Sequence, residues 1–124
     1  MPMLFEFLCI TATILFTVFG QLIIKWRVSQ LEPFPAGEAS KLMHAFFLVF
    51  DPFIFAGIFA AFLASITWIA AVSRMELSFA YPFIALNFML VILFSVFLFN
   101  ESLTPFKILG MIFIMLGIFF TAKS

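Results

Sequence analysis

Four polar side chains occupy every fourth position of the first apolar segment: Thr13, Thr17, Gln21 and Lys25, together called the polar stripe here. Residues four apart lie on nearly one face of a helix, because each is displaced by only about 40° around the axis. Hydroxyls and an amide can hydrogen-bond a polar headgroup, and an ammonium can bind a phosphate. Polar groups are costly against lipid. The stripe therefore predicts a face turned toward a partner helix, a cavity or a ligand.

Each of these side chains also has an ordinary structural interpretation. A threonine hydroxyl in a membrane helix often bonds a backbone carbonyl one turn back. The Lys25 ammonium can extend to the lipid headgroups. Gln21 carries two donors and an acceptor, more than one backbone bond satisfies, so we expect it to bond across helices or to a ligand.

Further polar residues lie in other parts of the chain. Asn87, near the middle of the third apolar segment, could join helices at about 1 kcal/mol or read a polar headgroup. Tyr81 and Pro82 open that segment, as an interface tyrosine and a first-turn proline would. We place Tyr81 and Asn87 with the polar stripe as candidate substrate-binding residues. Glu6 lies near the membrane boundary, where a carboxylate is cheap, so we expect a solvated edge charge.

The composition places the chain in a lipid bilayer. Its 124 residues are 66% hydrophobic and 10% charged, whereas a soluble domain is about 45–50% apolar and about 25% charged. The net charge is zero, so nothing indicates a nucleic-acid partner. The chain has no nucleophile with a base, no metal-ligand cluster and no phosphate loop, so we expect no catalytic residues, metal or cofactor. The single Cys9 allows no internal disulfide.

Four apolar segments are long enough to cross a bilayer, which takes about 20 residues. Asp51 before Pro52 is typical of a helix start. The short connections at 73–77 and 100–104 predict that spans two, three and four form a tight up-and-down bundle. The longer first connection includes a possible interfacial helix over about 40–50. The sequence thus predicts one all-α transmembrane domain over 1–124, with spans at about 3–24, 53–72, 78–99 and 105–122.

Small residues indicate where helices pack closely. Gly57, Ala61 and Ser65 recur at spacing four in the second span, and Gly110 and Gly117 lie seven apart in the fourth. Four bundled helices fill their own centre with side chains and leave no path. We therefore expect a transporter built from this chain to be at least a dimer, with the two glycines of span four at the contact. Lysine and arginine are nearly balanced between the two sides, so parallel and antiparallel pairs stay open.

The four-span layout resembles the drug/metabolite transporter superfamily, in particular small multidrug resistance-like and EamA-like proteins. The similar motifs are Thr17-Val-Phe-Gly20 before Lys25, Phe79-Ala-Tyr81, Gly110 with Gly117, and Phe99-Asn-Glu101-Ser-Leu-Thr104. Small multidrug resistance proteins carry a glutamate at the position of Thr17, which binds protons and cationic substrate in turn. Threonine does not titrate, so exchange by that route is not expected.

Gly20-Gln21 with Lys25, and Ala80-Tyr81-Pro82 followed by Leu86-Asn87-Phe88, resemble more closely the branch of four-span flippase subunits. Those proteins move aminoarabinose-phosphoundecaprenol across the bacterial inner membrane. The resemblance implies a flippase subunit for a lipid-linked sugar or similar amphiphile. It also implies a pair formed with itself or with a related four-span subunit, and favours an antiparallel pair. Thr17, Gln21 and Asn87 would then read the headgroup and Lys25 the phosphate.

Two other functions stay open. The chain could be a small multidrug resistance-like exporter of cationic or amphiphilic compounds, coupled through another group such as Glu6. It could also be an accessory membrane subunit that transports nothing and stabilises or regulates a partner.

Overall fold

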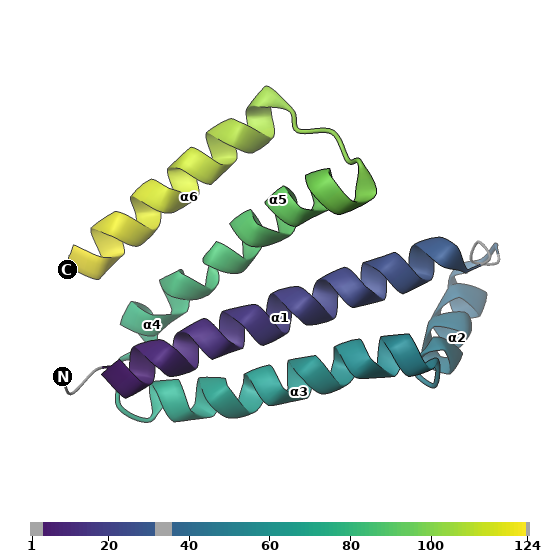
Figure 1. The fold of residues 1–124 in the computed structure, drawn as a ribbon, viewed down its shortest axis with the longest axis horizontal. Helices are drawn as coiled ribbons and strands as arrows, with labels where there is room; N and C mark the ends of the chain where they lie inside the picture. The colour runs from purple at the N-terminus through teal and green to yellow at the C-terminus, as the bar shows by residue number, and fades with distance from the viewer. Residues whose placement is uncertain (1–3, 32–35, 124) are drawn as a thin grey trace.

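The computed structural model describes residues 4–31 and 36–123, and the described residues form six helices (Figure 1). Four stretches are long and apolar enough to cross a membrane, the third being α4 and α5 together. This confirms the predicted all-α class with four spans. The helices are α1 (Leu4–Gln30), α2 (Glu38–Leu48), α3 (Pro52–Val72), α4 (Leu77–Ile84), α5 (Leu86–Phe99) and α6 (Pro105–Lys123).

The helix ends follow from local chemistry. The Asp51 carboxylate accepts hydrogen bonds from the backbone N–H groups of Phe53 (3.1 Å) and Ile54 (3.3 Å). This N-cap satisfies two otherwise unpaired donors and confirms the predicted start of the second span. The first helix continues to Gln30, beyond the predicted end at 24. α2 coincides with the stretch predicted to form an interfacial helix, and its place at a membrane surface stays a prediction.

Helices α1 and α3 run antiparallel and form the most extensive contact in the fold (Figure 1). Their backbones meet at two glycines. A Cβ added at Gly20 would lie 2.7 Å from the carbonyl oxygen of Gly57, and one added at Gly57 would lie 2.6 Å from Cγ1 of Ile24. Only hydrogen fits at these points, so the two glycines allow a close approach that larger residues would prevent.

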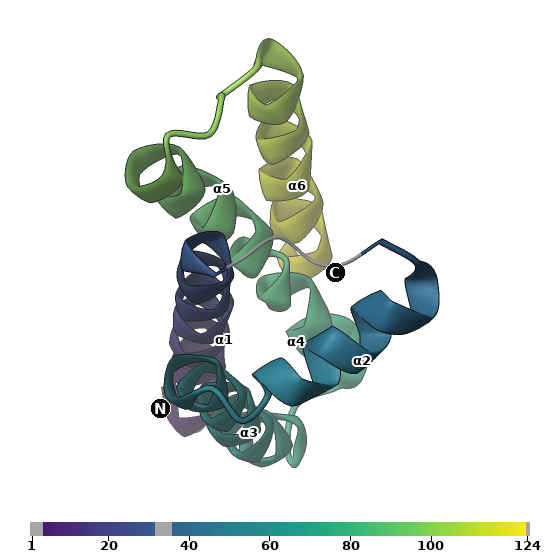
Figure 2. The same cartoon turned by 90° about the vertical axis from the view of Figure 1, so that its right-hand side faces the viewer.

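The predicted tight bundle of spans two to four is wrong. α3 contacts α4 only sparsely, and α6 makes few contacts with α4 and α5. α6 lies farthest from α3 (Figures 1 and 2). A short turn keeps the ends of two consecutive helices close together, but it does not determine how closely the helices pack along their length. Lipid does not drive apolar helices together as water does. Close packing follows small residues that meet, and these are on α1 and α3.

The third span is interrupted at Ala85, where α4 ends and α5 begins. Because α4 starts at Leu77, Pro82 lies inside the helix and not in its first turn as predicted. Proline has no N–H for the usual bond and crowds the carbonyl four residues back. Tighter bonds replace the regular pattern, from Ala85 N–H to the Pro82 carbonyl and from Phe88 N–H to the Ala85 carbonyl, both 3.0 Å.

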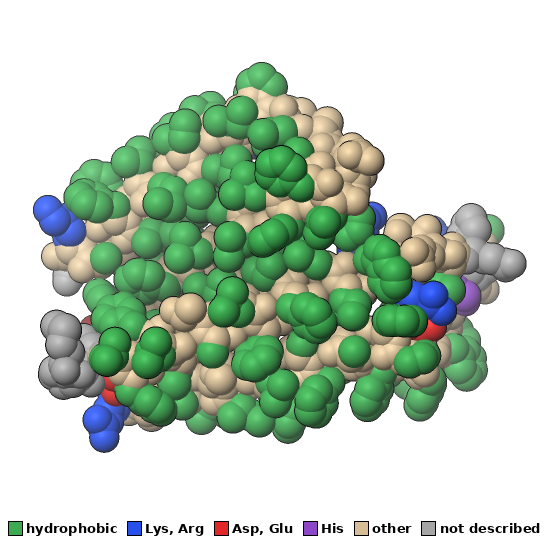
Figure 3. Space-filling view, viewed as in Figure 1, with side chains coloured by type: hydrophobic (Ala, Val, Ile, Leu, Met, Phe, Trp, Pro, Cys, Tyr) green, Lys and Arg blue, Asp and Glu red, His purple; other side chains and the backbone are tan. Residues whose placement is uncertain are grey.

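The molecular surface is that of a protein surrounded by lipid. In the face drawn in Figure 3, apolar side chains cover the middle and charged side chains lie toward the two ends of the long axis. Many large apolar side chains are exposed on every transmembrane helix. In water this surface would be strongly unfavourable. The chain is a multi-pass membrane protein.

Candidate substrate site

A pocket of about 210 Å³ lies between α1, α3 and α4. Four hydroxyl-bearing residues line it from three helices: Thr13 and Thr17 from α1, Ser65 from α3 and Tyr81 from α4. Trp68 lines it as well, and we call it the hydroxyl pocket. Ala61, Ala64 and Ile84 complete its wall. The structure therefore brings together three of the six predicted substrate-binding residues, which are Thr13, Thr17 and Tyr81.

The hydroxyl of Thr13 is engaged within the protein. It donates to the Cys9 carbonyl oxygen at 2.8 Å or to the Thr67 hydroxyl at 2.6 Å. Thr67 in turn donates to the Ala64 carbonyl oxygen at 2.9 Å. This network runs from the buried Thr13 to the half-buried Thr67 and joins α1 to α3 beside the pocket. Thr13 thus has the structural role that threonine often takes in membrane helices, and it also shapes the pocket wall.

The other hydroxyls of the pocket retain hydrogen-bonding capacity. Ser65 donates to the Ala61 carbonyl oxygen at 3.1 Å and keeps its acceptor lone pairs. The Thr17 hydroxyl makes no hydrogen bond within residues 4–31 and 36–123. Trp68 and Tyr81 form an edge-to-face pair, with ring centroids 5.9 Å apart and planes inclined by 76°. The pocket thus combines hydroxyls that can still accept or donate hydrogen bonds with an amphipathic aromatic wall.

The polar stripe continues beyond the pocket. Gln21 and Lys25 are exposed and are not among the pocket-lining residues. The stripe turns by about 40° per step, so its later members rotate away from the α1–α3 contact. They lie one and two turns beyond Thr17, toward the end of α1 that leads to α2.

Asn87 lies outside the hydroxyl pocket, just after the interruption of the third span. The residue is half-buried, and its buried Oδ1 has no hydrogen-bond partner among the described residues. A buried acceptor without a donor costs free energy, so such atoms usually have a partner. Asn87 is therefore open to a bond with a ligand, a water molecule or another subunit.

Glu6 is buried, with 1% of its surface exposed, so the predicted solvated edge charge is wrong. The reason is helix geometry. Glu6 lies seven residues before Thr13, which returns to the same face of α1, the face that packs on α3. Arg74 Nε lies 3.8 Å from Glu6 Oε1. The seven-residue spacing from Thr13 could have indicated the burial of Glu6 from the sequence. The position of Glu6 near the helix end favoured the opposite interpretation.

The opposite end of the α1–α3 pair is joined by an ion pair. Arg27 Nε lies 3.1 Å from both carboxylate oxygens of Asp51. This contact holds the pKa of the Asp51 carboxyl below its usual value, and the capping hydrogen bonds lower it further, against a smaller opposing effect of desolvation. The Arg27 guanidinium also lies over the Phe53 ring, 5.2 Å from its centroid. Arg27 is thus held in place, whereas the neighbouring Lys25 is exposed.

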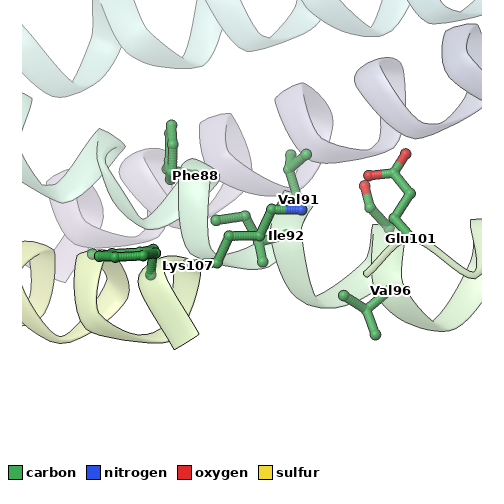
Figure 4. A pocket seen from close by; sticks show the side chains of 9 residues that line it. Phe88, Val91, Ile92, Val96, Glu101 and Lys107 are labelled. Carbon is green, nitrogen blue, oxygen red and sulfur yellow. The ribbon is translucent and has the colours of Figure 1, made fainter. Parts of the chain in front are cut away.

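A second cavity, of about 490 Å³, lies between α5 and α6 (Figure 4). Its wall is mostly apolar, with Glu101 and Lys107 among the lining residues. Gly110 lines this cavity, and nothing lies within 4 Å of the Cβ that Gly110 or Gly117 would carry. These two glycines make no close helix contact within the described chain, so their packing role stays a prediction about a partner.

The four spans define this chain as a multi-pass membrane protein with a hydroxyl-lined pocket among its helices. It belongs to the EamA-like transporter family, whose model matches residues 3–123. No solved structure matches it.

The chain is similar to three proteins described as probable 4-amino-4-deoxy-L-arabinose-phosphoundecaprenol flippase subunit ArnF. The protein of Aeromonas salmonicida is 35% identical over 118 residues, covering 94% of this chain and 78% of the relative. That of Aeromonas hydrophila is 36% identical over 113 residues, covering 90% and 75%. That of Serratia proteamaculans is 32% identical over 111 residues, covering 86% and 84%.

Proposed function

We propose that this chain is one subunit of a flippase that moves a sugar linked to phosphoundecaprenol across the bacterial inner membrane. The hydroxyl pocket carries the proposal, because it offers hydrogen-bonding groups and aromatic rings among the membrane spans. The names of the relatives, which describe subunits of such a flippase, support the same substrate class.

The pocket chemistry suits a sugar headgroup. The hydroxyls of Thr17 and Ser65 can hydrogen-bond sugar hydroxyls, and the C–H face of a sugar ring can pack against Trp68 or Tyr81. A polar headgroup in the bilayer is costly unless the protein replaces its hydrogen bonds to water. The pocket hydroxyls would supply those hydrogen bonds. The lipid tail needs no pocket, because it stays in the hydrocarbon.

The exposed part of the polar stripe suits the phosphate. Lys25 lies eight residues beyond Thr17, about 12 Å along the helix axis. Its ammonium can form charge-assisted hydrogen bonds with a phosphate. Gln21 lies between the two positions and can bond the headgroup as it passes. In this arrangement, α1 provides a polar path from the pocket toward one membrane surface.

A second subunit completes the path. The hydroxyl pocket and α6 both have surfaces that no described residue covers, and a second subunit would cover them. The second subunit is either another copy or a related four-span chain.

Vesicles containing the purified flippase and 4-amino-4-deoxy-arabinose-phosphoundecaprenol test the proposal. The measurement is exposure of the headgroup on the outer leaflet. We expect Gln21→Leu and Asn87→Leu to slow transport about tenfold, because an unpaired polar group costs about 1–3 kcal/mol, with the folded yield unchanged. Lys25→Ala should weaken handling of the anionic lipid.

Gln30→Leu is the matched control, because Gln30 is an exposed amide at the end of α1, outside the polar stripe. Transport by this variant should equal that of the wild type. Headgroups that stay on one leaflet with the wild-type protein would contradict the proposal. Drug resistance conferred on host cells instead would favour the exporter. Loss of folded protein in both leucine variants would make Gln21 and Asn87 structural.

A further inference from the structure

A buried carboxylate, that of Glu6, lies at the end of α1 opposite Lys25. Both of its oxygens are buried, and neither has a hydrogen-bond partner among the described residues. The Arg74 guanidinium is near, with Nε 3.8 Å from Oε1, but 77% of the Arg74 side chain is exposed. The contact is therefore coulombic, because this separation is too long for a hydrogen bond.

A buried carboxylate is stable only when it is paired and its oxygens receive hydrogen bonds. Arg74 supplies charge but no hydrogen bond. A primary ammonium supplies both, because it carries one positive charge and three N–H donors on a single small atom. The chemistry missing at Glu6 is that of an ammonium group.

The position of Glu6 connects it to the substrate path. It lies on the same face of α1 as Thr13 and Thr17, eleven residues from Thr17, or about 16 Å along the axis. Lys25 lies nineteen residues from Glu6, or about 28 Å, close to the thickness of the hydrocarbon core of about 30 Å. One helix thus carries a carboxylate near one membrane surface and an ammonium near the other.

We propose that Glu6 binds the ammonium group of an amine-bearing lipid headgroup at the end of α1 opposite Lys25. This inference rests on the proposed flippase function and specifies its substrate as an amino sugar. Arg74 neutralises the site when it is empty and withdraws when the headgroup amine arrives. The names of the relatives specify a sugar with an amino group at C4, which is the chemistry the site requires.

In this proposal, the turn between α3 and α4 controls access to Glu6. Arg74 lies in this turn, and its single long contact to Glu6 leaves it free to swing outward. α4 is held against α1 by edge-to-face ring contacts, with centroids 6.3 Å apart for Phe7–Phe79 and 5.8 Å for Phe7–Phe83. Such apolar contacts can shift without breaking a hydrogen bond, which permits the movement of α4 that the proposal requires.

The test compares two lipids in the same vesicles: 4-amino-4-deoxy-arabinose-phosphoundecaprenol and its N-acetyl derivative, which has no positive charge. A membrane-impermeant oxidant of vicinal diols detects both headgroups on the outer leaflet. Loss of a buried charge partner costs a factor of about ten or more, so Glu6→Gln should slow the amine lipid by that factor and leave the N-acetyl lipid unchanged. Glu76→Gln, which alters an exposed carboxylate of the same turn, should change neither rate.

Equal slowing of both lipids by Glu6→Gln would overturn the inference, because Glu6 would then act in folding or proton coupling. If the Glu6→Gln protein does not fold, Arg74→Gln decides. Removal of the competing cation should lower KM for the amine lipid alone, and an unchanged KM would overturn the inference. A wild-type protein that moves neither lipid would show that the proposed function itself fails, and the inference would fall with it.

Discussion

The α1–α3 pair and the α5–α6 hairpin are built from equally apolar helices, yet they pack in opposite ways. In the first pair, Gly20 and Gly57 bring two backbones together until only hydrogen fits between them. In the second, no atom of the described residues lies within 4 Å of a Cβ added at Gly110 or Gly117, and a cavity of about 490 Å³ separates the helices. The difference shows that glycine permits a close contact between membrane helices but does not produce one without a complementary surface.

The two helix pairs also differ in the roles we expect for them. The close pair carries three of the four hydroxyl-bearing residues of the pocket, Thr13, Thr17 and Ser65, so those groups stand on closely packed helices. Rigid support keeps hydrogen-bonding groups in place for a ligand. The loose hairpin has an unused small-residue surface, which we expect a second subunit to cover.

The largest expected effect is at the α1–α3 contact. Gly57→Leu would place a Cβ 2.6 Å from Ile24 Cγ1 and 2.9 Å from the Gly20 carbonyl oxygen. Overpacking of this kind costs about 1–3 kcal/mol or more. We expect a large loss of folded protein, measured by size-exclusion chromatography in mild detergent and by thermal unfolding.

Gly110→Leu is the control for that experiment, because no atom lies within 4 Å of its Cβ position. It should leave the thermal midpoint of the single subunit unchanged. If Gly57→Leu and Gly110→Leu are equally stable, the contrast between the two pairs does not exist in the membrane.

The second effect concerns the hydroxyl pocket. Thr17→Val removes a hydroxyl with almost no change in shape, so the close pair should remain folded. Loss of one hydrogen bond to a sugar, worth about 1 kcal/mol, should slow headgroup transport about fivefold. Thr11→Val is the matched control, because Thr11 is exposed on the same helix outside the pocket and donates to the Phe7 carbonyl oxygen. Equal transport by the two variants would remove Thr17 from the site.

The sequence predicts the spans well, because hydropathy and helix-end chemistry are local. The choice between neighbouring faces of one helix is not local. In α3, the predicted stripe of Gly57, Ala61 and Ser65 divides in the structure: Gly57 is buried against α1, whereas Ala61 and Ser65 are exposed and line the pocket. Small residues occur on both faces, and only the position of α1 decides which face it covers.

The polar residues show the same limit. Burial of Glu6 depends on α3 and the following turn, which are distant in sequence, so its position near a helix end was misleading. The hydroxyl pocket required Ser65 and Trp68 to be placed beside Thr17, and neither was a predicted substrate-binding residue. The only sequence signal for these two residues was their spacing of three, which places them on one side of α3.

The third effect concerns the loose hairpin. If α6 packs against a second subunit, Gly117→Leu should weaken that association by about 1 kcal/mol, since close backbone approach is lost. Crosslinking between cysteines introduced on α6 should then fall, while folding of each subunit is unchanged. Unchanged crosslinking would place the interface on another helix and leave the α6 glycines without a role in assembly.

The smallest expected effect concerns the Arg27–Asp51 ion pair, which joins α1 to the start of α3. The pKa of Asp51 is lowered in the folded protein, chiefly by its hydrogen bond to Arg27. A carboxyl with a lowered folded pKa stabilises the fold above its unfolded pKa, and this contribution is lost as pH falls through the folded pKa. The wild-type thermal midpoint should therefore fall more than that of Asp51→Asn between about pH 6 and about pH 3, because the asparagine carries no charge to lose. The difference should be small, because the pair is close to the surface and partly screened. Parallel curves for the two proteins would show that the Arg27–Asp51 pair contributes nothing to holding α1 on α3, which would leave the glycine contact and the Thr13–Thr67 hydrogen bonds to hold them.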